Sequence, residues 1–446
     1  MESKMKLLNK KWMWISLCVL LVSHNVYSQQ ETPASLVLTL CDALRMTDER
    51  NVNVIIANER VTQAIARIGT SRSTFLPQIK ASASETRQTR DLRSSGINLG
   101  FNTLVGPFNS FDGRVRLTQT IFDPAALKRL QAARDGQSLS FAEYEKVKED
   151  VLALVANMFI EARRAHDSLT VSDAVLKRDA KHRQIAQDRL RLGSGSEIEL
   201  SRAEADYQKS LFQKKAAETE SLERSLDLSA ALGFPKTKEL QLVWDENFKM
   251  PLDLKSFPNL ENHPAIQVAQ KQLDQSKSQA LVQKGEYLPK ISVSGDYGSS
   301  GVKPTDASET YALGVQATMP IFEGGLRQSN IKEAESIVKT NEANLQDVER
   351  YVEADIAVNR QLIDQAKMLI NQKDAELAVA QKQFQLSQDR LKSGIGNEVE
   401  FLDAQAMLAN AQDQKEEAKA VDVLAQINYL RALGRLEEVI TKGAGQ

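Results

Sequence analysis

Residues 187–199 read QDRLRLGSGSEIE, and residues 388–400 read QDRLKSGIGNEVE. The two stretches align without a gap, and the same offset carries the ALG at 231–233 onto the ALG at 432–434. Self-similarity at one fixed spacing indicates a repeated structural unit. The chain is therefore a tandem duplication, and each copy contains a Gly-x-Gly turn.

The similarity between the copies extends upstream of these turns. FLPQI at 75–79 resembles YLPKI at 287–291, and each copy continues to an Ile-Phe pair, at 121–122 and 321–322. The predicted organisation is therefore repeat 1, a proline-rich linker and repeat 2, at 29–235, 236–262 and 263–446.

Each copy is expected to begin with a helix, near 39–72 or 263–285, and to continue with a β-hairpin, at 75–123 or 287–322. Residues 311–319 alternate between apolar side chains and small or polar ones, as the two faces of a strand require. Glycine, serine and asparagine are frequent in the loops expected inside the two hairpins, at 94–110 and 299–308.

The strand expected near residue 115 is amphipathic as well. Phe111, Val115 and Leu117 fall on one face, and Arg114 and Arg116 fall on the other. Such strands suit a sheet with one apolar and one polar side.

Long helices are predicted after each β-hairpin. No proline occurs from 125 to 234 or from 321 to the end, and a proline inside a helix costs about 3 kcal/mol. We expect long helical hairpins at 124–233 and 323–434, whose first helices would each measure about 100 Å. Apolar residues at three- and four-residue steps predict a coiled-coil seam: Tyr144, Val147, Val151, Leu154 and Met158, then Leu345, Val348, Val352, Ile356 and Ile363.

Residues 1–28 have the layout of a signal peptide. Four lysines precede an apolar run from Trp12 to Val22, which is too short to span a bilayer of ~30 Å. We expect cleavage after Ser28. The alternative, a lipid anchor on Cys18, is disfavoured by the large Leu17 before it.

The rest of the composition excludes several classes of protein. Loss of four lysines and Glu2 would take the net charge from −2 to about −5, which gives no general reason to bind nucleic acid. Cys41 alone would remain, so no intramolecular disulfide is expected.

His166, His182 and His263 are expected to be isolated surface residues. No zinc-binding, phosphate-loop or serine-nucleophile motif occurs, so we expect no enzyme, no cofactor and no metal site.

Four amphipathic strands in an exported chain raise the question of assembly. In lipid, backbone polar groups must be paired, so a membrane sheet closes into a barrel, and known membrane barrels begin at about eight strands. Several chains would therefore share one barrel. The alternative is a soluble four-stranded sheet that caps a coiled coil.

The whole mature chain resembles the TolC family of outer-membrane factors. The resemblance rests on LCDAL at 40–44, the two Leu-Pro strand entries, the two Ile-Phe strand exits and both glycine-containing tips. It implies an α+β, mainly α fold and a homotrimer with a twelve-stranded β-barrel in the cell outer membrane. A periplasmic α-helical barrel would continue it.

The resemblance also implies a function. The chain would be the channel, or exit duct, of a tripartite efflux or type I secretion system, gated at the periplasmic helical tips and passive in transport. Its partners would be a periplasmic membrane fusion (adaptor) protein, an inner membrane efflux transporter and outer membrane lipid. Drugs, metal ions and secreted polypeptides are all candidate cargo.

In the TolC family, acidic residues just past the tips line the periplasmic entrance, which maps onto Glu199, Glu400 and Asp403. In an assembly, these residues would form rings of carboxylates. Alternatively, ion pairs between the hairpins would close the gate, because the repeat counterpart of Asp403 is the basic residue Arg202. A structural alternative is a capping box at each helix start, joining Ser196 to Glu199 and Asn397 to Glu400.

The tips also resemble the motif through which family members meet the adaptor. The residues that match are Arg189, Leu190 and Gly193 in the first copy, and Arg390, Leu391 and Gly394 in the second. The structural alternative is a helix C-terminus with basic residues and a left-handed glycine cap.

Two other functions use long helical hairpins. A periplasmic adaptor usually has one hairpin flanked by β-rich domains, whereas this chain has two hairpins. A soluble coiled-coil structural protein is the second alternative.

Overall fold

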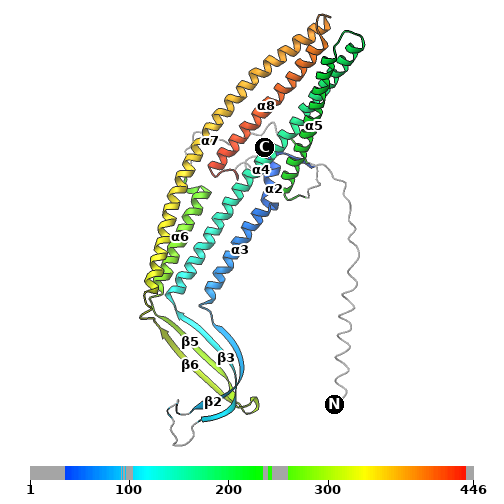
Figure 1. Cartoon of the computed structure of the whole chain (residues 1–446). Coiled ribbons are helices and arrows are strands. Elements are labelled where there is room, and N and C mark those ends of the chain that lie inside the picture. Colours follow the sequence, from blue (N-terminus) through cyan, green and yellow to red (C-terminus); the bar gives the residue numbers. More distant parts are fainter. Residues whose placement is uncertain are drawn as a thin grey trace, which may run out of the picture.

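The computed structural model describes residues 36–91, 93, 96, 104–234, 240–243 and 260–437. The expected signal peptide, most of the expected linker and much of the first hairpin loop lie outside the described residues. The molecule is long and curved, with a β-sheet at one end and two helical tips at the other (Figure 1).

The sheet has four antiparallel strands in the order β2-β3-β5-β6. Their bounds are β2 Gln78–Asp91, β3 Leu104–Phe122, β5 Lys290–Gly301 and β6 Ser308–Thr318. A 3-10 turn, η3 (Pro304–Asp306), lies between the last two. Each copy thus contributes one hairpin, and the first strand of the second copy pairs with the last strand of the first.

The long helical hairpins follow the sheet directly. They comprise α4 Pro124–Arg191 with α5 Glu197–Ala231, and α7 Leu326–Lys392 with α8 Glu398–Ala432. α4 begins where Asp123 accepts a hydrogen bond from the Ala126 backbone N–H at 2.9 Å, and Pro124 occupies the first helical position. Proline is compatible with that position because its missing N–H would have no partner there. At about 1.5 Å per residue, the 68 residues of α4 span about 100 Å.

The helix expected at 39–72 is two helices, α2 Leu40–Arg50 and α3 Val52–Ser73. The break is at Asn51, whose side chain caps α3 by accepting from Asn53 N–H at 2.9 Å. The same side chain donates to the Ala231 carbonyl at 2.8 Å. The expectation of one helix was wrong because asparagine competes for local backbone partners. The second copy has a single helix here, α6 Pro264–Gly285, preceded by a 3-10 turn, η2 Leu260–Asn262.

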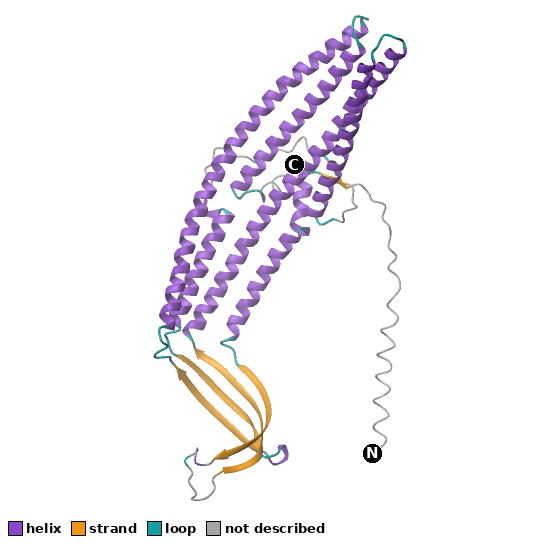
Figure 2. Ribbon diagram, viewed as in Figure 1, coloured by secondary structure: helices purple, strands orange, loops and turns teal. Residues whose placement is uncertain are grey.

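The helices form a single curved layer. Near the sheet the order of neighbours is α3-α4-α6-α7, and toward the tips it is α5-α4-α8-α7. α4 is therefore internal along its whole length, whereas α7 is at one edge throughout (Figure 2).

The main apolar core lies at the waist, where α2 and the ends of α5 and α8 meet α4. Its fully buried side chains include Phe159 and Ile160 of α4, Leu228 of α5 and Leu430 of α8. Two short parallel strands, β1 Leu36–Leu38 and β4 Leu240–Leu242, pair beside this core.

The predicted seam residues are mostly in the packed faces of the helices. Val151, Val352 and Ile363 are buried. The inclusion of Leu154 was wrong, because its side chain is 45% exposed on the other side of α4. Among the described residues, no helix is long and apolar enough to cross a membrane.

Candidate functional site at the hairpin tips

Both tips turn through the same helix-ending motif. At the first tip, the Ser194 N–H donates to the Arg189 carbonyl at 2.9 Å and the Gly193 N–H donates to the Leu190 carbonyl at 3.0 Å. This pair of bonds is the Schellman motif, which needs a left-handed residue after the helix. Gly193 has that conformation, with φ of 75°.

The second tip repeats these bonds. The Ile395 N–H donates to the Arg390 carbonyl and the Gly394 N–H donates to the Leu391 carbonyl, both at 3.1 Å. Gly394 also has φ of 75°. The left-handed cap at both glycines is therefore observed, and it accounts for them without any partner.

The second glycine of each turn is required for a different reason. A Cβ atom at Gly195 would lie 3.0 Å from the Leu190 nitrogen, and one at Gly396 would lie 2.6 Å from the Leu391 nitrogen. Both glycines allow the chain to pass close to the end of the preceding helix. The two tips therefore share one backbone design.

The first tip starts its returning helix with a capping box. The Ser196 hydroxyl accepts from the Glu199 N–H at 3.2 Å, and the Glu199 carboxylate accepts from the Ser196 N–H at 3.4 Å. This confirms the structural reading of Glu199, whose side chain is exposed at the surface but turned back on its own helix.

At the second tip the predicted capping box was wrong. Asn397 accepts from the Val399 N–H at 2.9 Å, one position earlier than Ser196 does. The Glu400 carboxylate pairs instead with Arg390 at 3.0 Å, across the turn. Asn397 thus caps the second backbone N–H of the helix, and the Glu400 carboxylate pairs with the arginine across the turn.

Asp403 joins the two hairpins. Its carboxylate lies 3.9 Å from Nε2 of His182, so α8 of the second copy faces α4 of the first. His182 was expected to be an isolated surface residue, which is wrong because its side chain is only 24% exposed. Its Nε2 is buried without a hydrogen-bond partner. The neighbouring Arg183 stacks on Tyr207 of α5, 4.0 Å from the ring centroid.

The candidate docking residues differ in exposure. Arg189 and Arg390 are exposed, whereas Leu190 and Leu391 are half-buried against the turn. The apolar side chains most exposed at the tips were missed: Leu192 at 76%, Ile395 at 77% and Ile198 at 65%. An apolar residue directly beside a left-handed glycine was the available signal, because a side chain at the end of a turn has no core to enter.

The structure thus pairs Glu400 with Arg390 and Asp403 with His182, and leaves Glu199 in its own capping box. Among the residues described, no group of three or more histidine, cysteine or acidic side chains is arranged to hold a metal ion.

Sequence comparisons extend over nearly all of the chain. A model of the outer membrane efflux protein family matches residues 44–234 and 259–435. Outer membrane protein TolC of Escherichia coli (strain K12) is 22% identical over 395 residues, which cover 84% of this chain and 78% of that protein. The pyoverdine export outer membrane protein OpmQ of Pseudomonas putida is 24% identical over 396 residues, which cover 85% and 82%.

A structural comparison finds the same architecture. The Campylobacter jejuni CmeC outer membrane channel matches with a TM-score of 0.76 and 17% sequence identity, over 91% of this chain and 89% of that one. At this identity the match speaks for the fold alone. It is a mainly helical fold with a small sheet, as the sequence predicted.

Proposed function

The chain belongs to the outer membrane efflux protein family, and from this membership we propose how it is assembled, gated and docked. It is located in the cell outer membrane as the exit duct of an efflux system. We propose that three copies form one twelve-stranded barrel and that the helices continue it as a tunnel through the periplasm. A periplasmic adaptor protein would meet the helical tips, and an inner membrane transporter would supply the energy.

The observation that supports assembly is the pair of open edges. β2 and β6 are the outer strands of the sheet, and each has a strand neighbour on one side only among the described residues. In lipid, an unpaired strand edge costs several kcal/mol for each unsatisfied backbone group. Pairing of β6 in one copy with β2 in the next removes both edges.

The number of copies follows from the width of the barrel. Two copies would give eight strands, and a barrel of that size is filled by its own side chains. Three copies give twelve strands, which makes the trimer the smallest closed assembly with room for an open lumen.

The helices offer a matching edge. α7 carries large apolar side chains that are exposed in the single chain, including Tyr351 at 71%, Val358 at 57% and Met368 at 73%. On the opposite edge, Phe212 of α5 is 73% exposed. Because α7 is an edge of the helical layer and these large apolar side chains would be buried by a neighbour, the α7 edge of one copy is expected to cover the α3 and α5 edge of the next.

Cysteine cross-linking tests this assembly. In a Cys41→Ser background, Ser82→Cys on β2 is combined with single cysteines along β6, from Ser308 to Thr318. One of the β6 positions should lie opposite residue 82 of the next copy and give covalently closed trimers in the outer membrane fraction. Ser82→Cys combined with Ser292→Cys on the inner strand β5 should give none. Closed dimers, or release of the protein by osmotic shock, would overturn the proposal.

We propose that Glu199, Glu400 and Asp403 line the periplasmic entrance. Around a threefold axis, each would become a ring of three carboxylates, and rings of carboxylates favour cations. The Asp403–His182 contact would hold the second hairpin against the first in the resting state. The Arg390–Glu400 pair would hold the second tip in its turned form.

Planar bilayer recordings test the gate. Glu400→Gln and Asp403→Asn should each lower the cation-to-anion permeability ratio by about threefold and weaken block by divalent cations, because the local potential becomes less negative. His182→Gln should raise the open probability. The matched control is Glu349→Gln, an exposed carboxylate about a third of the way along α7 and far from the tip. Unchanged selectivity and unchanged divalent block in the first two variants would contradict the gate.

We propose that the adaptor docks on the exposed tip surface around Arg189, Leu190 and Gly193, and around Arg390, Leu391 and Gly394. Leu192 and Ile395 supply the apolar centre of this surface, with the two arginines beside it. A photo-cross-linker at Leu192 or Ile395 should capture the adaptor in cells. The same group at Val105, at the far end of the molecule, should not. Equal capture from both ends would defeat the docking site.

Transport through this chain is proposed to be passive, without catalysis, cofactor or bound metal. The comparisons do not favour the alternatives of a periplasmic adaptor or a soluble coiled-coil protein.

A further inference from the structure

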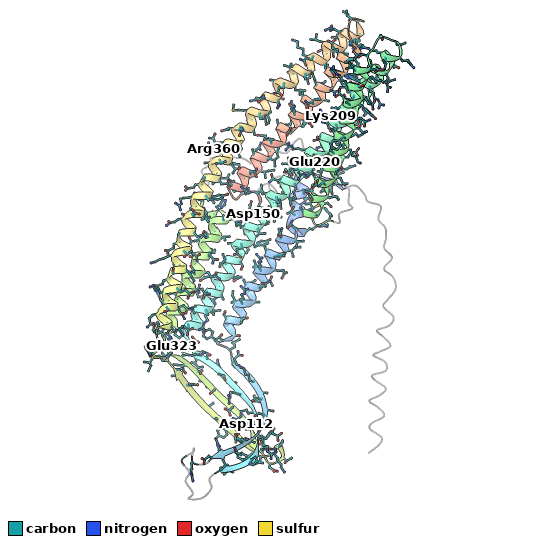
Figure 3. The ribbon with its side chains drawn as sticks, viewed as in Figure 1. Asp112, Asp150, Lys209, Glu220, Glu323 and Arg360 are labelled. Carbon is teal, nitrogen blue, oxygen red and sulfur yellow. The ribbon has the colours of Figure 1, made fainter. Side chains whose placement is uncertain are left out.

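The polar face of the sheet carries a group of charged side chains that the exit-duct function does not explain. Asp112, Arg114 and Arg116 follow one another on this face of β3. In the strand register, Arg116 lies opposite Lys80 of β2 on one side and Asp296 of β5 on the other. All five side chains therefore occupy one side of the sheet. Figure 3 shows Asp112 among the strands, at the opposite end of the molecule from Lys209 on the first helical hairpin.

Arg114 is held by two carboxylates. Its Nε and Nη2 donate to Asp112 at 2.7 and 2.6 Å, and its Nη1 donates to Asp296 at 2.9 Å. The residue opposite Arg114 on β5 is Gly298, where a Cβ atom would lie only 2.4 Å from the Arg114 Cβ. Glycine thus gives the arginine room to lie against the sheet between its two partners.

Arg116 and Lys80 are left with an uncompensated charge. Arg116 Nε is 3.8 Å from Asp296, the carboxylate that Arg114 already engages, and its side chain is 56% exposed. Lys80 is exposed directly opposite it. Like charges at directly opposed positions destabilise a sheet. The group contains three cations and two carboxylates, so each chain has one positive charge in excess.

The opposite face of the sheet is apolar, and this indicates that the face with the charged group is the one in contact with water. Tyr311, Leu313 and Val315 of β6 are 83%, 82% and 74% exposed on the face opposite the charged group. In a membrane barrel, the apolar face meets lipid and the polar face lines the lumen. The charged group therefore belongs to the inner wall of the barrel.

We propose that Lys80 and Arg116 form a cationic belt on the lumenal wall, which favours anions and anionic groups of the cargo. The belt rests on the proposed trimeric duct, in which three copies would repeat it around the lumen. It is a second charge-selective zone, of opposite sign to the carboxylates at the tips. The Debye length is about 8 Å at physiological ionic strength, so two zones at opposite ends of the molecule act independently. The effect of the belt should be largest at low salt.

Reversal potentials across a salt gradient test the belt in the purified trimer. The background is Glu400→Gln with Asp403→Asn, so that selectivity at the tips does not mask selectivity in the barrel. In this background, Arg116→Gln and Lys80→Gln should each raise the potassium-to-chloride permeability ratio by about twofold at low salt, because positive charge leaves the lumen. The shift should shrink as salt rises.

The matched control is Arg87→Gln. Arg87 lies on β2, like Lys80, but its odd position puts it on the apolar side of the strand. This variant should leave the permeability ratio unchanged, although it removes the same charge. Equal shifts from Arg87→Gln and Arg116→Gln, or no shift from Arg116→Gln and Lys80→Gln, would overturn the belt.

The two proposals fail in different ways. If the chain does not form a trimeric duct, the parent protein gives no stable trimer and no conductance. If only the belt is wrong, every variant forms trimers that conduct like the Glu400→Gln, Asp403→Asn background, and the permeability ratio does not depend on residues 80 and 116.

Discussion

The helices α4 and α7 are repeat counterparts of almost equal length, with 68 and 67 residues, but they occupy different environments. α4 packs between helices on both sides, and Phe159 is fully buried in the waist core. The repeat counterpart of Phe159 is Arg360, which is exposed on α7 (Figure 3). The two copies share the length and turn of the unit. Their residues differ where their positions in the layer differ, with a core residue in the internal helix and a charged residue in the edge helix.

The largest contrast is expected from truncation at these two positions. Phe159→Ala should lower the free energy of unfolding by about 3–5 kcal/mol, because it leaves a cavity in a fully buried site. Arg360→Ala should change it by less than about 0.5 kcal/mol. Denaturant unfolding in detergent measures both. Comparable losses would mean that α7 has its own core in the assembled protein.

A second contrast concerns Glu149 on α4 and its counterpart Arg350 on α7. Glu149 accepts from the backbone N–H groups of Leu436 and Glu437 at 3.0 and 3.3 Å. Burial, which outweighs these hydrogen bonds, raises the pKa of Glu149 from 4.5 to about 7. Arg350 is exposed and pairs with Asp347 on its own helix.

The raised pKa predicts a pH-dependent stability. The folded state binds the Glu149 proton more tightly than the unfolded state, so its contribution is complete below pH 4.5 and is lost as pH rises toward 7. The loss is on the order of 2–3 kcal/mol. Glu149→Gln should reduce the change of the unfolding free energy with pH between pH 4.5 and 7, and Arg350→Gln should leave that change as it is. An unchanged slope in Glu149→Gln would contradict the assignment.

The tip glycines should give a smaller contrast. Gly396→Ala places Cβ closer to the preceding backbone than Gly195→Ala does. The free energy of local unfolding of the tip turn should fall by about 1–2 kcal/mol in Gly396→Ala at the second tip and by less in Gly195→Ala at the first. Hydrogen exchange of residues 388–400 and 187–199 compares the two tips directly. Faster exchange at the first tip would reverse the expected order.

The smallest effect concerns the two helix starts. Ser196→Asn should move the cap to an earlier N–H, as at Asn397, and release Glu199 to pair with Arg189. A double-mutant cycle between positions 189 and 199 should then show a new coupling of about 0.2–0.5 kcal/mol, small because both side chains are exposed. In the native protein this coupling should be absent, and its presence there would contradict the capping box.

The sequence was sufficient to predict the fold because the signals for it are regional. Alternation over nine residues marked β6, and the absence of proline over more than a hundred residues marked the long helices. The break at Asn51 was missed because a helix boundary there depends on one side chain and on the distant Ala231 carbonyl. The β1–β4 pair was missed because three-residue strands carry too little pattern.

The candidate site was less predictable. Gly193 and Gly394 were identified because a left-handed turn has a local signature. The Asp403–His182 contact joins residues far apart in the chain, and no local pattern reports it. Asn397 and Ser196 both cap helices, but Asn397 binds the N–H two residues on and Ser196 the N–H three residues on. Side-chain length does not predict the difference, because Asp123, which is as long as asparagine, also binds the N–H three residues on.

The contact between Glu149 and the residues after α8 also has a consequence for the kinetics of folding. Phe159 and Leu436 belong to one core, yet they are separated by more than half of the chain. Contacts of such high sequence separation slow folding, and an exported chain leaves the translocation machinery from its N-terminus. The β1–β4 pair and the contacts of α4 with α2 and α5 can form once residue 242 has emerged. The part of the α4 face that packs against α8 and Leu436 must wait for residue 436 and stays exposed to water until then.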